Sequence, residues 1–161
     1  MRLLAAGASL PALAGATEVL HPPDDGGYAS LKDSSLTLRV HHGATAVLLT
    51  GDIEARAEER LLLAPARLPA AVLKVPHHGS RTSSTPRFVD AVAPRVAVVS
   101  VGADNRYRLP SPEVEARYRA RGTCVLRTDR CGAITVATDG ARLEVRTRRP
   151  GCACPTARPP W

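Results

Sequence analysis

From residue 36 onward, short apolar runs alternate with amphipathic segments. The ranges 36–40 and 45–49 are rich in Leu, Val and Thr and flank the residues 41–44, which predicts two strands joined as a hairpin. In the range 53–64 apolar residues recur at helical spacing, with Glu58 among the charged residues assigned to the wet side. The pattern therefore predicts a hairpin followed by an amphipathic helix.

The same alternation continues toward the C-terminus. Thr85-Pro86 and Ser111-Pro112 are start signals for two helices, because a hydroxyl residue caps a first turn in which proline needs no hydrogen-bonded amide. The order predicts an α/β fold with a mixed sheet flanked by helices. The remaining predicted elements are strands at 71–75, 95–101, 124–128, 133–138 and 142–147, and helices from residue 86 to 92 and from 112 to 118.

The length of 161 residues fits one domain. Residues 1–35 are interpreted as a helix-like apolar start, a short strand at Val19-Leu20 and a Pro- and Gly-rich loop; the alternative for the start is a signal peptide. Residues 36–147 form the folded portion, and 148–161 are expected to be a flexible Pro-, Arg- and Cys-containing tail. No apolar run of membrane-spanning length is present, so the sequence predicts no transmembrane segment.

The charge of the chain indicates which partners it could bind, whereas its cysteines do not determine the redox compartment. The net charge of +7, from 22 Lys and Arg against 15 Asp and Glu, suits nucleic acid or a membrane surface, although an Arg-rich composition alone would also produce it. Cys124 and Cys131 either pair in an oxidising compartment or remain small buried thiols, the interpretation the sequence favours. Cys152 and Cys154 are interpreted as incidental members of the tail.

Candidate chemistry lies where two predicted strands end. Asp52 follows the strand at 45–49, and His77 and His78 follow the strand at 71–75, one β-α-β unit later. Such strands are usually parallel neighbours, so the carboxylate and the imidazoles should meet at one sheet edge, where a hydrolytic metal site finds mixed N and O ligands. Taken alone, Asp52 is interpreted as the N-cap of the next helix, and only its relation to His77 and His78 favours the metal site. The similar pair at 41–42 lies in a hairpin and is not expected to be functional.

Several ordered motifs then resemble the hydrolase domain of the DNA-internalization competence (ComEC/Rec2) family. They are Leu-Leu-Thr-Gly-Asp-Ile-Glu at 48–54, Leu-Lys-Val-Pro-His-His-Gly-Ser-Arg-Thr-Ser at 73–83, and the runs at 94–102, 105–107 and 127–134. The resemblance extends from about Val19 to Val145. It implies the C-terminal half of a metallo-β-lactamase-like αβ/βα sandwich.

The resemblance also implies a reaction and a place for it. A pair of divalent metals, Zn or Mn, would hydrolyse phosphodiesters and degrade one DNA strand during uptake, on the extracytoplasmic face of the bacterial membrane. The expected partners are DNA, an upstream half-domain or a membrane channel protein. The implied site comprises Asp52 (catalytic and metal-binding), His77 (catalytic), His78 (metal-binding), and Ser80, Arg81, Asn105 and Tyr107 (substrate-binding).

Three departures from the family pattern bear on activity. The His-x-Asp-x-Asp-His metal motif is absent from the sequence, Leu109 stands where the family usually has a histidine, and Lys32 stands where an asparagine is usual. Two hypotheses therefore remain. One is an incomplete metal-dependent hydrolase module, and the alternative is an inactive remnant or basic nucleic-acid-binding fragment. Half a sandwich should also expose apolar surface, which predicts self-association.

Overall fold

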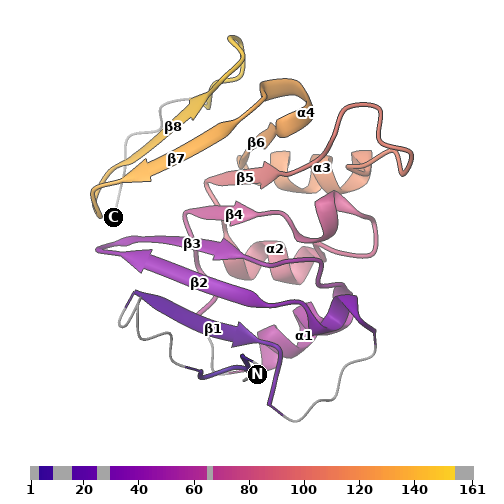
Figure 1. The fold of residues 1–161 in the computed structure, drawn as a ribbon, viewed down its shortest axis with the longest axis vertical. Coiled ribbons are helices and arrows are strands. Elements are labelled where there is room, and N and C mark those ends of the chain that lie inside the picture. The colour runs from indigo at the N-terminus through magenta and orange to yellow at the C-terminus, as the bar shows by residue number, and fades with distance from the viewer. Residues whose placement is uncertain (1–3, 9–15, 25–29, 65–66, 155–161) are drawn as a thin grey trace.

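A mixed sheet of six strands in the order β1-β2-β3-β4-β5-β6 dominates the computed structural model, which describes residues 4–8, 16–24, 30–64 and 67–154 (Figure 1). A separate hairpin, β7-β8, follows it in the chain. The strands are β1 (Thr17–His21), β2 (Thr37–His42), β3 (Thr45–Leu49), β4 (Val72–Lys74), β5 (Val96–Val99), β6 (Cys124–Arg127), β7 (Ile134–Thr138) and β8 (Leu143–Thr147).

The sheet is antiparallel on one side and parallel on the other. β1, β2 and β3 pair antiparallel, and the tight turn between β2 and β3 confirms the predicted hairpin. β3, β4, β5 and β6 run parallel, and their carboxyl ends therefore lie along one edge of the sheet. The adjacency of β3 and β4, which was expected from right-handed β-α-β connection, is confirmed.

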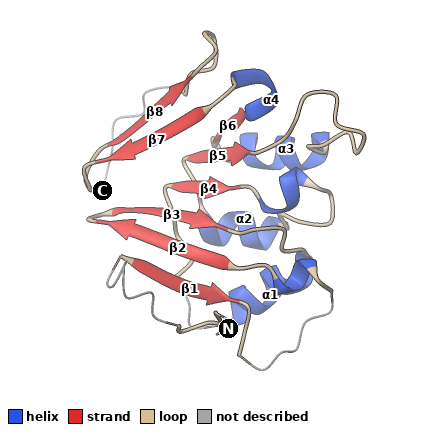
Figure 2. Ribbon diagram, in the orientation of Figure 1, coloured by secondary structure: helices blue, strands red, loops and turns tan. Residues whose placement is uncertain are grey.

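Three helices cover one face of this sheet (Figure 2). α2 begins as predicted, because the Thr85 hydroxyl accepts the amide of Phe88 and Pro86 occupies the first turn. α1 is preceded by Glu54 rather than Asp52, so the N-cap interpretation of Asp52 is wrong. The helices are α1 (Ala55–Leu63), α2 (Pro86–Val92), α3 (Pro112–Arg119) and the short α4 (Thr128–Cys131), with single 3-10 turns at Lys32–Ser34 and Pro76–Gly79.

Strand side chains alternate between two apolar clusters, one on each face of the sheet. On β4, Leu73 packs under the helices while Val72 faces the opposite side, and on β5 Ala97 and Val96 divide in the same way. The helical side includes Phe88 and Tyr118, both fully buried. The runs that appeared continuously apolar in sequence are thus strands buried on both faces.

The second apolar cluster lies between the parallel strands and the β7-β8 hairpin. Two disulfides lie within it, Cys124–Cys154 and Cys131–Cys152. The prediction of buried free thiols is therefore wrong, and so is the alternative pairing of Cys124 with Cys131. Residues 148–154, expected in a flexible tail, are held to β6 and α4 by these bonds, while 155–161 lie outside the described residues.

The α/β class and the mixed sheet flanked by helices are confirmed, whereas a metallo-β-lactamase-like sandwich is not. The predicted strand at Val19-Leu20 is the centre of β1. Of the expected helix-like start, residues 4–8 form a turn and 9–15 lie outside the described residues. The proposed boundaries at 35 and 147 stay predictions. Within the described ranges, no helix combines the length and the apolar character that crossing a bilayer requires.

Candidate functional site

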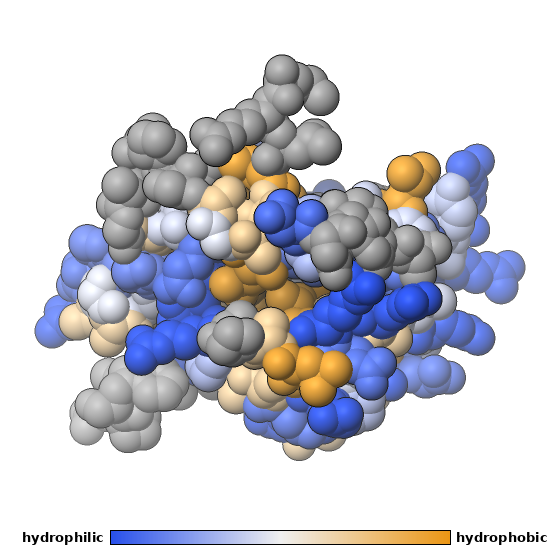
Figure 3. All heavy atoms as spheres, turned by 90° about the horizontal axis from the view of Figure 1, so that it is seen from below, coloured by the Kyte–Doolittle hydropathy of each residue, from blue (hydrophilic) through white to orange (hydrophobic). Residues whose placement is uncertain are grey.

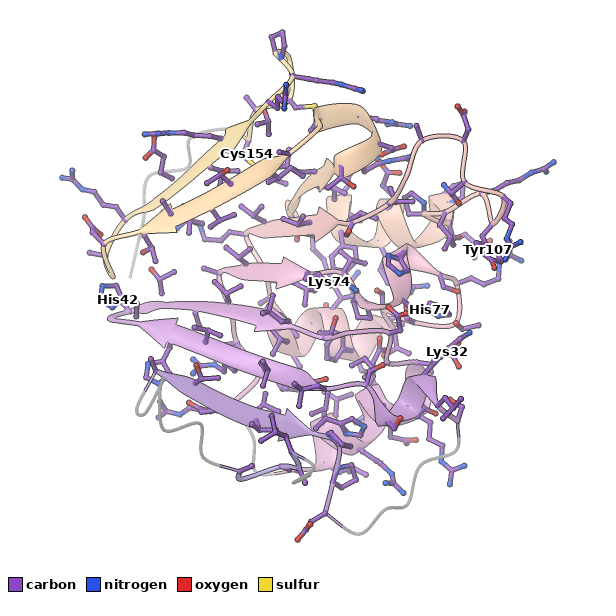
Figure 4. The ribbon with its side chains drawn as sticks, viewed as in Figure 1. Lys32, His42, Lys74, His77, Tyr107 and Cys154 are labelled. Carbon is purple, nitrogen blue, oxygen red and sulfur yellow. A yellow bond between two sulfur atoms is a disulfide. The ribbon has the colours of Figure 1, made fainter. Side chains whose placement is uncertain are left out.

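A cleft of about 1130 Å³ opens at the carboxyl edge of the parallel strands. Its near wall comes from the segments that leave β3 and β4, and its far wall comes from the loop after β5 and from the ends of α3 and β6. In Figure 4, Lys32, Lys74, His77 and Tyr107 lie at this end of the sheet, while His42 lies at the opposite end. The cleft is lined by Lys32, Asp52, His77, His78, Ser80, Arg81, Asp104, Asn105, Tyr107, Arg108, Leu109, Pro110, Ser111, Pro112, Arg127 and Asp129.

A tight turn after β4 orients the side chains of His77 and His78. His77 and His78 have φ of 45° and 55°, a left-handed conformation that is uncommon for residues with a side chain. Gly79 follows with φ of 80°, and a Cβ built on it would lie 2.5 Å from Cβ of Pro110 in the far wall. Glycine is thus required at this position for two reasons, its positive φ and the close approach of the two walls.

The buried carboxylate of Glu58 anchors the segment that follows the turn. Glu58 on α1 is fully buried and accepts the amides of Ser84 and Thr85, so its predicted placement on the wet side is wrong. Arg117 donates to the Ser84 carbonyl and the Tyr118 hydroxyl to Ser84 Oγ. Burial raises the pKa of the Glu58 carboxyl, against the hydrogen bonds that lower it. This network fixes the base of the histidine loop.

Asp52 lies between two basic side chains. Its Oδ1 is 3.5 Å from Nε2 of His78 and 3.6 Å from Nζ of Lys74. Nδ1 of His78 is 2.6 Å from the Ser100 carbonyl, which orients the ring. Lys74 also donates to the Gly51 carbonyl at 2.7 Å, and its burial lowers the pKa of its ammonium group despite the neighbouring carboxylate. The negative charge of Asp52 is therefore already compensated within the chain.

His77 belongs to a second carboxylate group on the same wall. Its Nδ1 is 3.2 Å from Oε1 of Glu54, which also accepts Thr82 Oγ1 at 2.8 Å and Lys32 Nζ at 3.3 Å. Partial burial opposes ionisation of Glu54, but the hydrogen bonds from Thr82 and Lys32 hold its pKa below the usual value. Burial, followed by the charge of Lys32, lowers the pKa of the His77 imidazole. Glu54 is accordingly a charged acceptor that orients His77.

The far wall is braced from within. The side-chain amide of Asn105 donates to the carbonyls of Gly102 and Leu109, and its oxygen accepts the Leu109 amide at 2.8 Å. This closed set of bonds shapes the loop that exposes Tyr107, which is 66% accessible. The Arg106 guanidinium lies 4.7 Å from the centre of the Tyr107 ring. Asn105 is therefore a loop brace, with its polar groups directed at the backbone.

All seven residues predicted for the site line this one cleft. Strand-end position was the signal that found Asp52, His77 and His78. Sequence reasoning missed Glu54, Lys74, Thr82, Arg108 and Arg127 as members of the cleft or its supports. Their residue types carry no sequence signal, because polar and charged residues at the ends of elements are ordinarily solvated. The individual catalytic and substrate-binding roles stay predictions.

The described side chains around Asp52 do not form the ligand set that the expected divalent metals need. Asp52 and His78 meet, yet in the described ranges no three His, Cys, Asp or Glu residues are grouped so that they could hold a metal ion. The cation next to Asp52 is the ammonium group of Lys74. These residues do not fit a dinuclear site, which needs bridging and terminal ligands on both ions. The divalent metal stays a prediction from the sequence.

Comparison with known proteins relates the chain to competence proteins. Competence protein ComA of Neisseria gonorrhoeae is 45% identical over 101 residues, covering 62% of this chain and 15% of the relative. ComE operon protein 3 of Bacillus subtilis is 38% identical over 106 residues (66% and 14%), and Recombination protein 2 of Haemophilus influenzae is 34% identical over 115 (71% and 14%). The chain thus spans only 14–15% of the length of these relatives. No protein-family model matches it.

These relatives overturn two expectations. The similarity is to competence proteins of the ComA and ComE operon protein 3 type, and the assignment to a metallo-β-lactamase-fold hydrolase domain is corrected accordingly. The expected metal-dependent degradation of a DNA strand is corrected with it, because the names of these relatives describe competence and recombination and not a metal-dependent nuclease. The similarity to a competence protein remains.

Proposed function

We propose that this chain is a DNA-binding module of a bacterial DNA-uptake protein, and that it holds the phosphate backbone of DNA in the cleft at the carboxyl edge of the parallel strands. The observation that carries the proposal is the pair of unpaired guanidinium groups in that cleft. Arg81 and Arg108 are exposed on opposite walls, and neither forms an ion pair with any residue in the described ranges.

The acidic groups of the cleft do not cancel this charge. Asp52 is matched by Lys74, and Asp129 receives two hydrogen bonds from Arg127, at 3.0 and 2.6 Å. Of the lining carboxylates, Asp104 alone has no ion pair among the described residues. Two free arginines and the net charge of +7 therefore favour a polyanion.

The shape of the cleft supports a backbone ligand in particular. Arginine side chains on two facing walls can contact phosphates on either side of an extended strand, which positions a nucleic acid without reading its sequence. The hydroxyl of Ser80 on the near wall adds a neutral group of the kind that binds phosphate oxygens, whereas the neighbouring Thr82 hydroxyl donates to Glu54. Among the relatives, the name Recombination protein 2 favours DNA as the nucleic acid, because recombination acts on DNA.

The proposal includes a location at the cell envelope. Two disulfides that close loops of 30 and 21 residues suit a protein that matures in an oxidising compartment, because cytosolic thiols are kept reduced. The relatives are far longer than this chain, so the proposed partner besides DNA is the remainder of such an uptake protein, its membrane channel included. Apolar surface also gathers at the β1 end of the molecule (Figure 3), where the self-association expected from the sequence stays a prediction.

Fluorescence anisotropy with a labelled single-stranded oligonucleotide tests the proposal. We expect Arg81→Ala and Arg108→Ala each to weaken binding and to reduce the slope of log affinity against log salt by about 0.7. Arg142→Ala is the matched control, because Arg142 is equally exposed but lies in the β7-β8 turn at the opposite end of the sheet. Equal effects of all three substitutions would contradict the proposal, as would binding that does not depend on salt.

A further inference from the structure

A second hollow adjoins the cleft and differs from it in chemistry. It has a volume of about 480 Å³ and shares His78, Asn105, Tyr107 and Leu109 with the cleft. Beyond these shared residues the cleft is lined by charged side chains, whereas the hollow is lined by uncharged residues, namely Ser100, Val101, Gly102 and Thr128. A mainly apolar hollow thus opens directly beside a cationic cleft.

We propose that this hollow is a nucleobase subsite, in which an unpaired base of the bound strand stacks against Tyr107 and rests on Leu109 and Val101 while its phosphates remain in the cleft. The inference rests on the proposed function and adds to it a ligand group and a specificity. A base presents a flat apolar face and a polar edge, and aromatic rings bind such faces independently of sequence.

The hollow is already built for such a ligand. The loop that carries Tyr107 is closed by the Asn105 hydrogen bonds to Gly102 and Leu109, so the loop backbone does not have to be ordered on binding. The opposite side is held by Thr128, whose hydroxyl accepts the Val101 amide and donates to the Val101 carbonyl, both at 2.7 Å. A preformed hollow lowers the entropic cost of binding.

The exposed ring itself points to a stacking partner. Tyr107 remains 66% accessible although it lines two concave surfaces, and the Arg106 guanidinium is stacked over it. Aromatic stacking and arginine cation–π contacts are both features of proteins that bind single strands. Leu109 matters equally, because a leucine at this position keeps the floor of the hollow apolar where a histidine would add a polar group.

If a base binds in this hollow, the protein should bind a strand with bases more tightly than a strand that carries only the sugar-phosphate backbone. We would measure the anisotropy of two labelled strands with the same number of phosphates, one with normal bases and one made of abasic sites. The wild-type chain should bind the base-bearing strand about tenfold more tightly, the gain expected from one stacked base. It should also prefer that strand to a duplex, whose bases cannot enter the hollow.

Substitutions of Tyr107 test whether the preference for the base-bearing strand arises in the hollow. Tyr107→Ala should bring the affinity for the base-bearing strand down to that for the abasic strand, and Tyr107→Phe should keep the tenfold preference because the ring is retained. Arg81→Ala should weaken both strands equally and leave their ratio unchanged. Because Tyr107 is exposed, its substitution should not disturb folding, which circular dichroism checks.

The outcomes separate this inference from the proposed function. Equal, salt-dependent binding of both strands by the wild-type chain would overturn the subsite and leave backbone binding standing. Failure to bind either strand would overturn both proposals. A preference for bases that survives in Tyr107→Ala would also overturn the subsite, because the base would then be recognised elsewhere.

Discussion

Gly79→Ala tests the account of how the two walls of the cleft meet. Gly79 combines a φ of 80° with a hypothetical Cβ only 2.5 Å from Cβ of Pro110. Gly122 after α3 offers a matched control, since it has a similar φ of 73° but no atom within 4 Å of its hypothetical Cβ. Both substitutions impose the left-handed penalty of about 1–2 kcal/mol and the same gain from a less flexible unfolded chain. Only Gly79→Ala adds a steric conflict.

That conflict should cost about 1–3 kcal/mol more, because the Pro110 loop or the histidine turn must shift to admit the methyl group. Urea unfolding of both variants with the disulfides intact measures the difference in free energy of unfolding. The Gly79 variant should also lose affinity for single-stranded DNA, whereas the Gly122 variant should not. Equal losses of stability in the two variants would refute the reasoning about wall contact.

Three further predictions concern the buried carboxylate, the disulfides and the metal. Burial raises the pKa of Glu58 in the folded state, so the protonated carboxyl stabilises the fold below about pH 4.5, and this stabilisation is lost as pH rises through the raised pKa. The urea unfolding midpoint of the wild type should therefore fall with rising pH over this range. Glu58→Gln should abolish the slope, and an unchanged slope would assign it elsewhere. Replacing Cys124 and Cys154 together by serine should cost about 3 kcal/mol in urea unfolding, and an unchanged midpoint would contradict the pairing. Titration calorimetry with Zn²⁺ should detect no tight site, whereas tight binding lost in Asp52→Ala would show that the donor set is larger than described.

Much of the parallel half of the fold could be predicted because its signals are local. The run at 71–75 that contains β4 is apolar except for Lys74, and Thr85 with Pro86 marks the start of α2 by chemistry that acts within one turn. The adjacency of β3 and β4 then followed from the handedness of β-α-β units. These two steps were sufficient to bring Asp52 and His78 together.

The features that were missed depend on residues distant in sequence. Glu58 carries the charge pattern of a solvated helix face, and its burial is determined by amides of Ser84 and Thr85, 26 and 27 residues later. The cysteine pairing depends on where the segment after β8 crosses α4 and β6, which local pattern does not encode. Thr128–Cys131 was missed because a helix of four residues is too short to show a period.

The cleft differs from the predicted catalytic site in the partners of its charged groups. The sequence identified Asp52 and His77 as chemistry-bearing residues, but the structure supplies each with a partner from this chain, Lys74 and Glu54 respectively. The charged groups of the cleft left without such partners are Arg81, Arg108 and Asp104, considering the described residues alone, and two of these three are cationic. Because Asp52 is already paired within the chain, the arginines on the two walls are the better candidates for contacting a ligand.

The most direct test of DNA binding at this cleft is a titration of the isotope-labelled chain with a short single-stranded DNA, followed by NMR through backbone amide shifts. The account predicts that the largest shifts fall in two segments, residues 77–82 and 102–110, which form the facing walls. It predicts small shifts in the β7-β8 turn at the opposite end of the sheet. Shifts concentrated in that turn, or spread evenly over the basic surface, would contradict the central claim.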